Sequence, residues 1–288
     1  MRQCEWTYEP GPIPWHDPGA ASQVLYEQAR GLSAEAGDGP WCVVWAAGAA
    51  TTSTPPEQAL AELEPLTGML TGLRSARPSG PGAVFITSSA GGIYAGSTGA
   101  PFDDATPPAP LSAYGELKLA QETLARDVLE GICPVVVGRI GNLYGPGQNL
   151  AKLQGLISRL ALSAVTQQPT NIFVPLDTIR DYIYVDDAAR AVLDAVHAAA
   201  AGDHARTRTH VIASGQGSTV GQVVRTMNLV AKRRVPVALG SHPSAFAQST
   251  DLRLTPTDPL DATMPLPAGM KTVFLDILSR VQAHSLAG

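Results

Sequence analysis

The 288-residue sequence has few cysteines and little net charge. Cys4, Cys42 and Cys133 are odd in number and far apart, with no CxxC spacing, so neither a disulfide framework nor a zinc site is indicated. A reducing cytoplasm is the simplest compartment for such a chain. The net charge is −5 and the basic residues are scattered rather than clustered, which predicts no nucleic-acid partner.

Long hydrophobic runs are also lacking. No apolar run reaches the roughly 18 residues that a membrane-spanning helix needs, and the opening MRQCEWTYEPGP has no apolar core of the signal-peptide kind. We therefore expect a soluble protein with no membrane partner. A chain of this length forms either one large domain or two domains that share a core, and the hydrophobic content of 44% is enough to bury that core.

Several catalytic signatures are missing as well. The sequence contains no GxSxG nucleophile elbow, no HExxH and no GKS/T phosphate loop. His197, His204 and His210 have no metal-ligand spacing, so we predict no metal site.

What the sequence does contain is an alternation of helices and buried strands. The runs WCVVWAAG (41–48), AVFITSS (83–89) and CPVVVGRI (133–140) are typical of strands buried on both faces. Amphipathic helices are predicted from Ser22, from Pro55–Pro56 and over 112–129. This alternation predicts a Rossmann-like, doubly wound parallel sheet whose ligands gather at the carboxyl ends of the strands.

The pattern changes after Gly147. Shorter strand patterns (IFVP, HVIAS, PVAL) and helical patterns near 150–167, 186–200 and 217–232, with a terminal helix from Lys271, predict a smaller α/β lobe. We therefore divide the chain into a Rossmann-like domain at 1–147 and a substrate lobe at 148–288 that is interleaved with it.

A tyrosine and a lysine lie on the same face of the helix predicted over 112–129. Tyr114 and Lys118 are four positions apart. An ammonium beside a phenol lowers a tyrosine pKa that is ordinarily about 10, which suits proton transfer near neutral pH. The spacing alone is also compatible with an accidental pair on a solvated helix face.

Four segments together carry a family resemblance. They are the serines that close AVFITSS, the YxxxK helix, RIGNLYGPG after the next strand, and RDYIYVDDAARA before a later helix. In this order they resemble the extended short-chain dehydrogenase/reductase family, the NAD-dependent epimerases and dehydratases that act mostly on nucleotide sugars. The resemblance runs from about residue 41 to the end.

The resemblance implies roles for the residues in these segments. Tyr114 would be the acid/base at a substrate hydroxyl, and Lys118 would lower its pKa and hold the cofactor ribose. Ser89 would hydrogen-bond the substrate oxygen, with Ser88 as the competing choice because TSSAGGIY has one more residue before its tyrosine than the common pattern. Either serine could instead be a satisfied strand-end hydroxyl.

Further residues are assigned in the same way. Asn142 and Tyr144 would lie near the nicotinamide or the substrate, unless GNLYGPG is only a turn. Arg180 is a candidate for a substrate diphosphate, with a structural ion pair to Asp181 or Asp187 as the alternative. The small side chains of Ala46, Ala47 and Gly48 would let the backbone approach the cofactor pyrophosphate, or would serve tight strand-to-helix packing.

The strongest cofactor motif of the family is missing. The sequence has no GxxGxxG turn, and EWTYEPGPIPWHD most resembles a later strand with its acidic residue, which would place Asp17 near the adenosine. The first strand, helix and second strand therefore look absent, and the resemblance implies impaired NAD or NADP binding. Either the true start lies upstream, or this is a shortened member that has lost catalysis.

Two functions follow from the resemblance. The first is an NAD(P)-dependent epimerase, dehydratase or reductase acting on a nucleotide sugar or a related hydroxy or keto compound, with dimerisation through the helices near 55–76 and 112–129 as a family expectation. The second is a noncatalytic binding or regulatory protein. A Tyr114→Phe variant separates them, because only the first function needs the phenol.

Overall fold

A parallel sheet forms the centre of the molecule. The computed structural model describes residues 11–150, 155–202, 207–241 and 248–287. The main sheet has the order β1-β2-β3-β7, and every neighbouring pair in it is parallel. Its strands are β1 (Trp41–Trp45), β2 (Gly82–Ser89), β3 (Val135–Ile140) and β7 (Arg208–Ile212). The predicted α/β architecture with a parallel sheet is confirmed.

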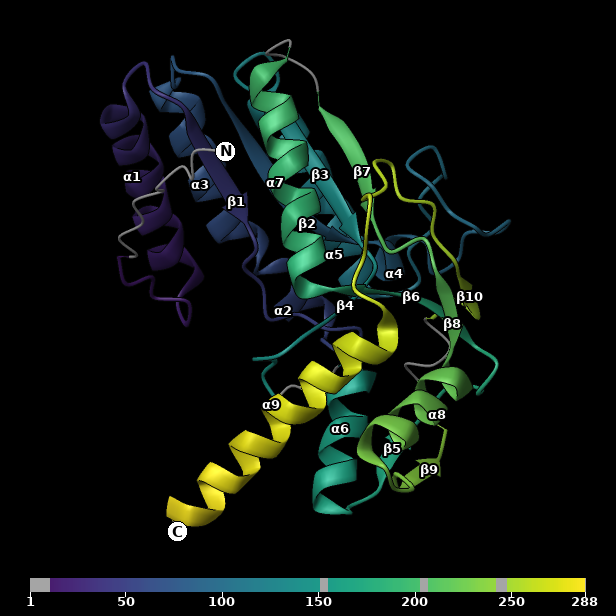
Figure 1. The fold of residues 1–288 in the computed structure, drawn as a ribbon. Coiled ribbons are helices and arrows are strands. Elements are labelled where there is room, and N and C mark those ends of the chain that lie inside the picture. Colours follow the sequence, from purple (N-terminus) through teal and green to yellow (C-terminus); the bar gives the residue numbers. More distant parts are fainter. Residues whose placement is uncertain (1–10, 151–154, 203–206, 242–247, 288) are drawn as a thin grey trace.

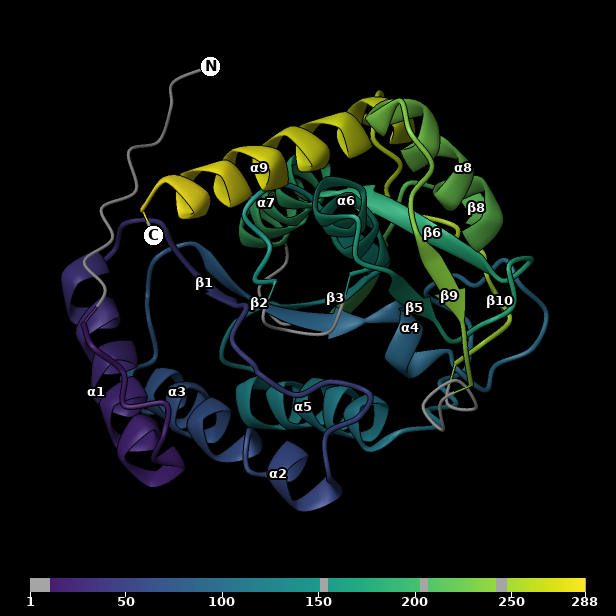
Figure 2. The same ribbon diagram turned by 90° about the horizontal axis from the view of Figure 1, so that it is seen from below.

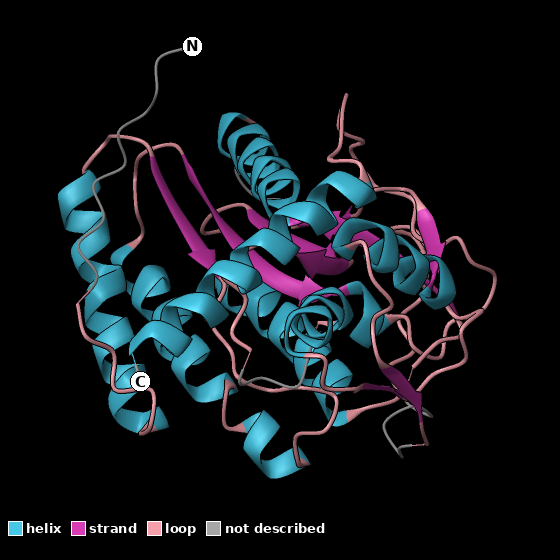
Figure 3. Cartoon of the chain, turned by 60° about the horizontal axis from the view of Figure 1, so that its bottom comes forward, coloured by secondary structure: helices cyan, strands magenta, loops and turns pink. Residues whose placement is uncertain are grey.

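Helices cover both faces of this sheet (Figures 1 to 3). One layer holds α1 (Pro18–Ala36), α2 (Pro56–Leu60), α3 (Leu63–Ala76) and α5 (Ala113–Leu129), and α7 (Val185–Ala201) lies on the other face. The alternation of side chains along β2 explains the two layers. Val84 and Ile86 pack with the first layer, whereas Ala83 and Phe85 pack with α7.

Two helix boundaries differ from those predicted. Helix α1 begins at Pro18, before Ser22, because the Asp17 carboxylate accepts a hydrogen bond from the Ala20 amide at 3.0 Å and caps the helix. The single helix predicted after Pro55 is two, α2 and α3. Pro65 explains the break, since it has no amide for a helical bond and is tolerated only in a first turn.

The rest of the chain forms a lobe with small sheets. β4 (Asn142–Tyr144), β6 (Ile179–Tyr184) and β10 (Asp251–Leu252) are parallel in the order β10-β6-β4, and β8 (Gly217–Thr219) pairs antiparallel with β6. β5 (Thr170–Ile172) pairs with β9 (Val237–Leu239). Helices α6 (Leu156–Thr166), α8 (Val220–Ala231) and α9 (Leu266–Ala287) enclose a second core, and the short α4 (Ala90–Ile93) follows β2.

The two parts of the chain are interleaved in space. Helix α7 and strand β7 come after residue 147, yet they pack on and extend the main sheet. The domain boundary at 147 and the dimer stay predictions. The strand pattern expected within 1–20 falls partly on residues 1–10, and both Cys4 and His204 also lie outside the described residues.

Helices α1 and α3 pack at unusually close range. A Cβ on Gly68 would overlap the carbonyl oxygen of Ser22, and one on Gly72 would lie 2.5 Å from the carbonyl oxygen of Tyr26. Glycine is therefore required on α3 for this contact, even though it weakens a helix.

A Gly68→Ala substitution should lower the free energy of unfolding by about 1–3 kcal/mol, the usual cost of overpacking. Gly31 on α1 is the matched control, since a Cβ there meets nothing within 4 Å. Gly31→Ala should stabilise the protein by roughly 0.5–1 kcal/mol. Urea denaturation of both variants tests this, and equal effects would contradict the close-packing explanation.

Candidate active site

Tyr114 and Ser89 meet at the carboxyl end of the main sheet. Ser112 begins α5 by accepting a hydrogen bond from the Gly115 amide at 3.2 Å, which places Tyr114 in the first turn. Ser89 closes β2 and accepts a hydrogen bond from the Gly92 amide at 3.1 Å, so its hydroxyl caps α4. The Tyr114 ring lies against Gly92, since a Cβ on that glycine would lie 3.2 Å from the ring, and the Ser89 side chain lowers the pKa of the phenol as a hydrogen-bonding group. The structure thus brings together a phenol and a hydroxyl from two elements.

Lys118 lies one helical turn after Tyr114 and is buried. Its Nζ atom is 5.8 Å from the centre of the Tyr114 ring. It donates hydrogen bonds to the carbonyl oxygen of Thr87 at 3.3 Å and to Oε1 of Gln121 at 3.0 Å. The ammonium is therefore held by neutral partners at the same end of β2 as Ser89.

The pKa of Tyr114 differs from the expectation. Burial raises the pKa of this phenol above its ordinary value, the hydrogen bond with Ser89 opposes that rise, and the Glu62 carboxylate adds to it. Burial lowers the pKa of Lys118, and Glu62 and Glu122 oppose that fall. The Lys118 ammonium donates its hydrogen bonds to Thr87 and Gln121 and lies 5.8 Å from the centre of the Tyr114 ring. That Lys118 lowers the pKa of Tyr114 stays a prediction.

The two candidate serines have different surroundings. The Ser88 hydroxyl is buried and donates a hydrogen bond to Oε1 of Glu122 at 2.6 Å. Ser89 faces Tyr114 instead. This difference favours Ser89 over Ser88 for contact with a substrate, since Ser88 is already bound to a buried carboxylate.

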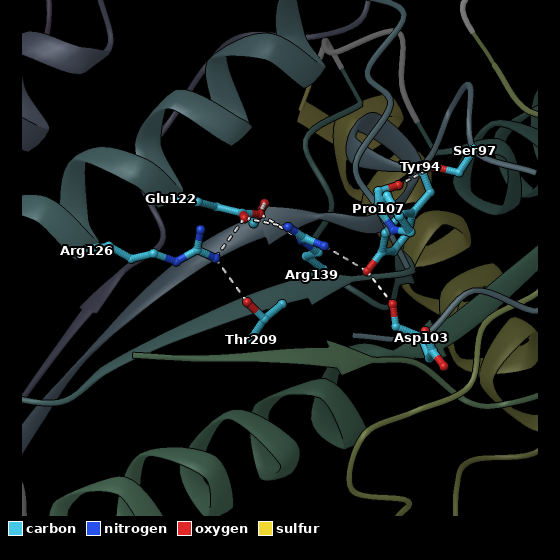
Figure 4. A network of polar contacts seen from close by, with 9 residues as sticks. Tyr94, Ser97, Asp103, Pro107, Glu122, Arg126, Arg139 and Thr209 are labelled. Carbon is cyan, nitrogen blue, oxygen red and sulfur yellow. Dashed lines mark hydrogen bonds and ion pairs between the residues drawn. The ribbon is translucent and has the colours of Figure 1, made fainter. Parts of the chain in front are cut away.

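Glu122 is the centre of a buried polar network (Figure 4). Arg139 on β3 donates to it from Nε at 3.0 Å and from Nη2 at 2.8 Å, and both side chains are buried. Arg139 also donates to the Tyr94 hydroxyl at 3.0 Å, which in turn donates to the carbonyl oxygen of Asp103 at 2.7 Å. Arg126, which is partly exposed, lies 3.4 Å from Glu122. The network fixes α5 against β2, β3 and the segment that follows α4.

The loop after β1 holds the small residues Ala46, Ala47 and Gly48. Gly48 has φ +147°, and a Cβ on it would lie 2.9 Å from Oε2 of Glu62. Oε1 of Glu62 accepts hydrogen bonds from the amides of Ala49 and Ala50, each at 2.6 Å. The glycine thus leaves room for a carboxylate at this strand end, and Ala47 packs against the core of the first helix layer.

Asn142 and Tyr144 have structural partners. The Asn142 side-chain amide donates to the carbonyl oxygen of Asp181 at 3.1 Å, across the β4–β6 pair. The Tyr144 ring is 4% exposed and packs edge-on against Tyr182 and Tyr184. Burial raises the pKa of the Tyr144 phenol. These contacts give Tyr144 a packing role in the C-terminal lobe.

Arg180 on β6 is buried. In the described chain, none of its hydrogen bonds goes to a carboxylate. It donates to the carbonyl oxygen of Ile179 at 2.8 Å and to Oε1 of Gln248 at 3.2 Å. Asp181 accepts from Ser214, and Asp187 pairs with Arg190. The alternative of an Arg180 ion pair with Asp181 or Asp187 is therefore wrong. Burial lowers the pKa of Arg180.

Asp17 caps α1, as described above. Because α1 precedes β1 and runs antiparallel to it, this cap lies toward the carboxyl end of the sheet (Figure 1). Trp15 packs edge-on against Trp45 at 6.2 Å between ring centres, which anchors the segment before α1 to the end of β1. A contact between Asp17 and an adenosine stays a prediction.

Neither a metal cluster nor a membrane-spanning helix is found in the part of the chain that the structure describes. No group of three or more His, Cys, Asp or Glu side chains is arranged there to hold a metal ion. None of the described helices is both long and apolar enough to cross a bilayer.

Three charged residues of this region, Glu62, Glu122 and Arg139, were not predicted from the sequence. Glu122 and Arg139 lie inside the motifs YGELKLAQE and RIGNLYGPG. Charged residues are rarely buried unless they are paired, so one acidic and one basic residue in two buried segments could have indicated an ion pair. The position of Glu62 could not be predicted in this way. It depends on the break between α2 and α3, which was not predicted and which places Glu62 against the loop after β1.

Comparison with known proteins identifies the family of the chain. The model of the NAD dependent epimerase/dehydratase family matches residues 31–212. The chain is 32% identical over 124 residues to a dTDP-L-rhamnose 4-epimerase of Burkholderia thailandensis, covering 42% of this chain and 33% of that protein. It is 30% identical over 152 residues to a dTDP-glucose 4,6-dehydratase of Neisseria gonorrhoeae, covering 52% and 40%. The matched region therefore spans well under half of these relatives.

Solved structures share the fold. The UDP-glucose 4-epimerase of Thermotoga maritima, solved with UDP-glucose, superimposes with a TM-score of 0.74 at 20% identity, over 91% of this chain and 83% of that one. A structure described as a putative epimerase from Burkholderia cenocepacia gives a TM-score of 0.70 at 24% identity, over 94% and 87%. These TM-scores establish a common Rossmann-like fold. With the family model matching more than half of its residues, the chain belongs to the NAD-dependent epimerase/dehydratase family.

Proposed function

We propose that the chain is an NAD- or NADP-dependent epimerase- or dehydratase-type enzyme that acts on a nucleotide sugar. The observation that carries this proposal is the meeting of Tyr114 with Ser89, beside buried Lys118, at the carboxyl edge of the parallel sheet. The curated relatives support the substrate class, since they are enzymes of dTDP- and UDP-linked sugars.

Each of these residues has a proposed role. Tyr114 takes a proton from a sugar hydroxyl or returns it, and Ser89 hydrogen-bonds the same oxygen, which orients it toward the phenol. Lys118 supplies a positive charge next to the phenol. Asn142 stays a weaker candidate for substrate or nicotinamide contact, because its amide is bonded to β6.

Arg180 is the proposed contact for the diphosphate. Its guanidinium is buried, its hydrogen-bond partners in the described chain, Ile179 and Gln248, are neutral, and the Asp251 carboxylate acts on it without a hydrogen bond, so an anion in direct contact would stabilise its charge. A planar guanidinium also binds phosphate oxygens through two parallel hydrogen bonds.

The described residues fit the reactive end of a nicotinamide cofactor. When bound, that cofactor accepts or donates a hydride at the sugar carbon. Lys118 and Tyr114 offer an ammonium and a phenol for its ribose hydroxyls, and the small side chains of Ala46 and Ala47 allow close approach, whereas the space beside Gly48 holds the Glu62 carboxylate. Because the sequence has no GxxGxxG turn to cradle the pyrophosphate, we expect weaker NAD binding than in relatives that carry one.

The test is product formation by the purified 288-residue chain with excess NAD or NADP. UDP- and dTDP-linked hexoses would be incubated with it and the products identified by chromatography and proton NMR. We expect an epimer or a 4-keto-6-deoxy product from at least one sugar. No product from any sugar, together with no saturable cofactor binding by fluorescence, would instead support a noncatalytic binding protein.

A further inference from the structure

A carboxylate binds the loop that follows β1, at the sheet edge where Tyr114 and Lys118 lie. Glu62 lies between α2 and α3, and its Oε1 atom accepts hydrogen bonds from the amides of Ala49 and Ala50, each at 2.6 Å. Gly48 provides the space, since a Cβ there would lie 2.9 Å from Oε2 of Glu62. The carboxylate is thus bound to the loop that follows β1.

Sheet register places this loop beside the Lys118 ammonium. Trp45, the last residue of β1, pairs with Ile86 of β2. Lys118 donates its hydrogen bond to the carbonyl oxygen of Thr87, one residue further along β2. The loop bound by Glu62 and the ammonium therefore lie at neighbouring strand ends on one edge of the sheet.

We propose that Glu62 is a positioning residue that fixes the loop 46–50 and places a negative charge at the strand ends where the Lys118 ammonium is bound. The proposal rests on the function proposed above, in which Lys118 must carry a positive charge beside the reacting phenol. Glu62 would act through Lys118 and the loop rather than by touching the substrate.

Among the described groups around Lys118, Glu62 is the carboxylate whose charge is not balanced by an arginine. The neighbours that accept its hydrogen bonds, Thr87 and Gln121, are neutral. Glu122 is the other nearby carboxylate, but its oxygens are bound by Arg139 and, more weakly, by Arg126. Glu62 is bound by backbone amides instead, so its negative charge is not offset by a guanidinium.

The electrostatics agree with this geometry. Burial lowers the pKa of Lys118, and the carboxylates of Glu62 and Glu122 oppose that fall. Glu62 also raises the pKa of Tyr114. Removing the charge of Glu62 should therefore lower the pKa of both groups, and in Lys118 the change acts in the same direction as burial.

The charge of Lys118 can be followed without any turnover. The sequence has four lysines, Lys118, Lys152, Lys232 and Lys271, so protein labelled with ¹³C at lysine Cε gives a simple NMR spectrum. A Lys118→Met variant assigns the Lys118 signal. The pH at which this signal titrates is then measured in the parent, in Glu62→Gln and in Glu64→Gln.

Glu62→Gln keeps an oxygen that can accept from Ala49 and Ala50 while it removes the charge. Glu64 is the matched control, because it is an exposed carboxylate two residues away in the first turn of α3. We expect the Lys118 midpoint to fall by about 1 pH unit in Glu62→Gln, as for loss of one nearby opposite charge, and to stay unchanged in Glu64→Gln.

Other outcomes overturn the proposal. If the titration midpoint of Lys118 is the same in Glu62→Gln as in the parent, Glu62 only packs the loop. If the midpoint falls equally in Glu64→Gln, the effect comes from the overall negative charge of the surface and not from Glu62. If Glu62→Gln does not fold, Glu62→Ala and Glu62→Met are titrated in its place with the same expected fall. Failure of the sugar assay alone would count against the proposed function and would leave this titration unaffected.

Discussion

Replacing Tyr114 with phenylalanine should reduce turnover of the nucleotide sugar by about 10²–10⁴-fold, the range for loss of one general acid–base group. The reason is that the ring and its packing remain while the hydroxyl that meets Ser89 is lost. The fold should be preserved, because the hydrogen-bond partner that is left, Ser89, still caps α4. Steady-state product formation and a thermal melt of the same preparation measure both expectations.

A matched substitution controls for the loss of a hydroxyl as such. Tyr26 on α1 donates a weak hydrogen bond to Ser75 at 3.4 Å, away from the sheet edge that carries Tyr114. Tyr26→Phe should leave turnover within about twofold of the parent, which is the scatter of a surface change. If Tyr114→Phe behaved like Tyr26→Phe, the phenol would have no part in the reaction.

Substituting Glu122 with alanine should lower the free energy of unfolding by about 3–5 kcal/mol, the cost of breaking a buried ion pair on one side. The carboxylate and the Arg139 guanidinium are 0% and 4% exposed, so Arg139 would be left as a buried, unpaired charge. Ser88 would lose its acceptor as well. Chemical denaturation of Glu122→Ala and of the parent gives the difference.

Two further variants show whether the burial of the pair causes the effect. Arg126 also lies near Glu122, at 3.4 Å, but its side chain is 35% exposed, so Arg126→Met should cost no more than about 1 kcal/mol. A double variant, Glu122→Met with Arg139→Met, should recover much of the stability lost in Glu122→Ala, because no charge is then buried alone. Equal losses in all three variants would contradict this explanation.

The main sheet could be predicted from local pattern. Runs such as AVFITSS and CPVVVGRI are apolar on both faces, and only a parallel sheet covered by two helix layers buries both. The strands β4, β6, β8 and β10 were not predicted. In β6, Arg180 and Asp181 interrupt the apolar pattern of a buried strand. The strands β4, β8 and β10 have only two or three residues each and are fixed by their partner β6 rather than by their own composition.

The candidate site was predictable as a set of motifs but not as an electrostatic environment. The YxxxK spacing correctly placed Lys118 one turn from Tyr114, and strand-end serines are visible in the sequence. Which serine faces the phenol depends on the side-chain alternation at the end of β2, and Ser88 turns to Glu122. The effect of burial on the pKa of Tyr114 requires the packed structure, as does the position of Glu62.

The most direct test of proton transfer by Tyr114 is a single-turnover measurement on the NAD-loaded chain and its Tyr114→Phe variant. Each would be mixed with the nucleotide sugar identified in the product assay, and the absorbance of the reduced nicotinamide would be recorded. We expect reduction in the parent and a rate at least about 10²-fold lower in Tyr114→Phe, because hydride leaves the sugar carbon only as the hydroxyl loses its proton. Reduction at equal rates in the two proteins would contradict this expectation.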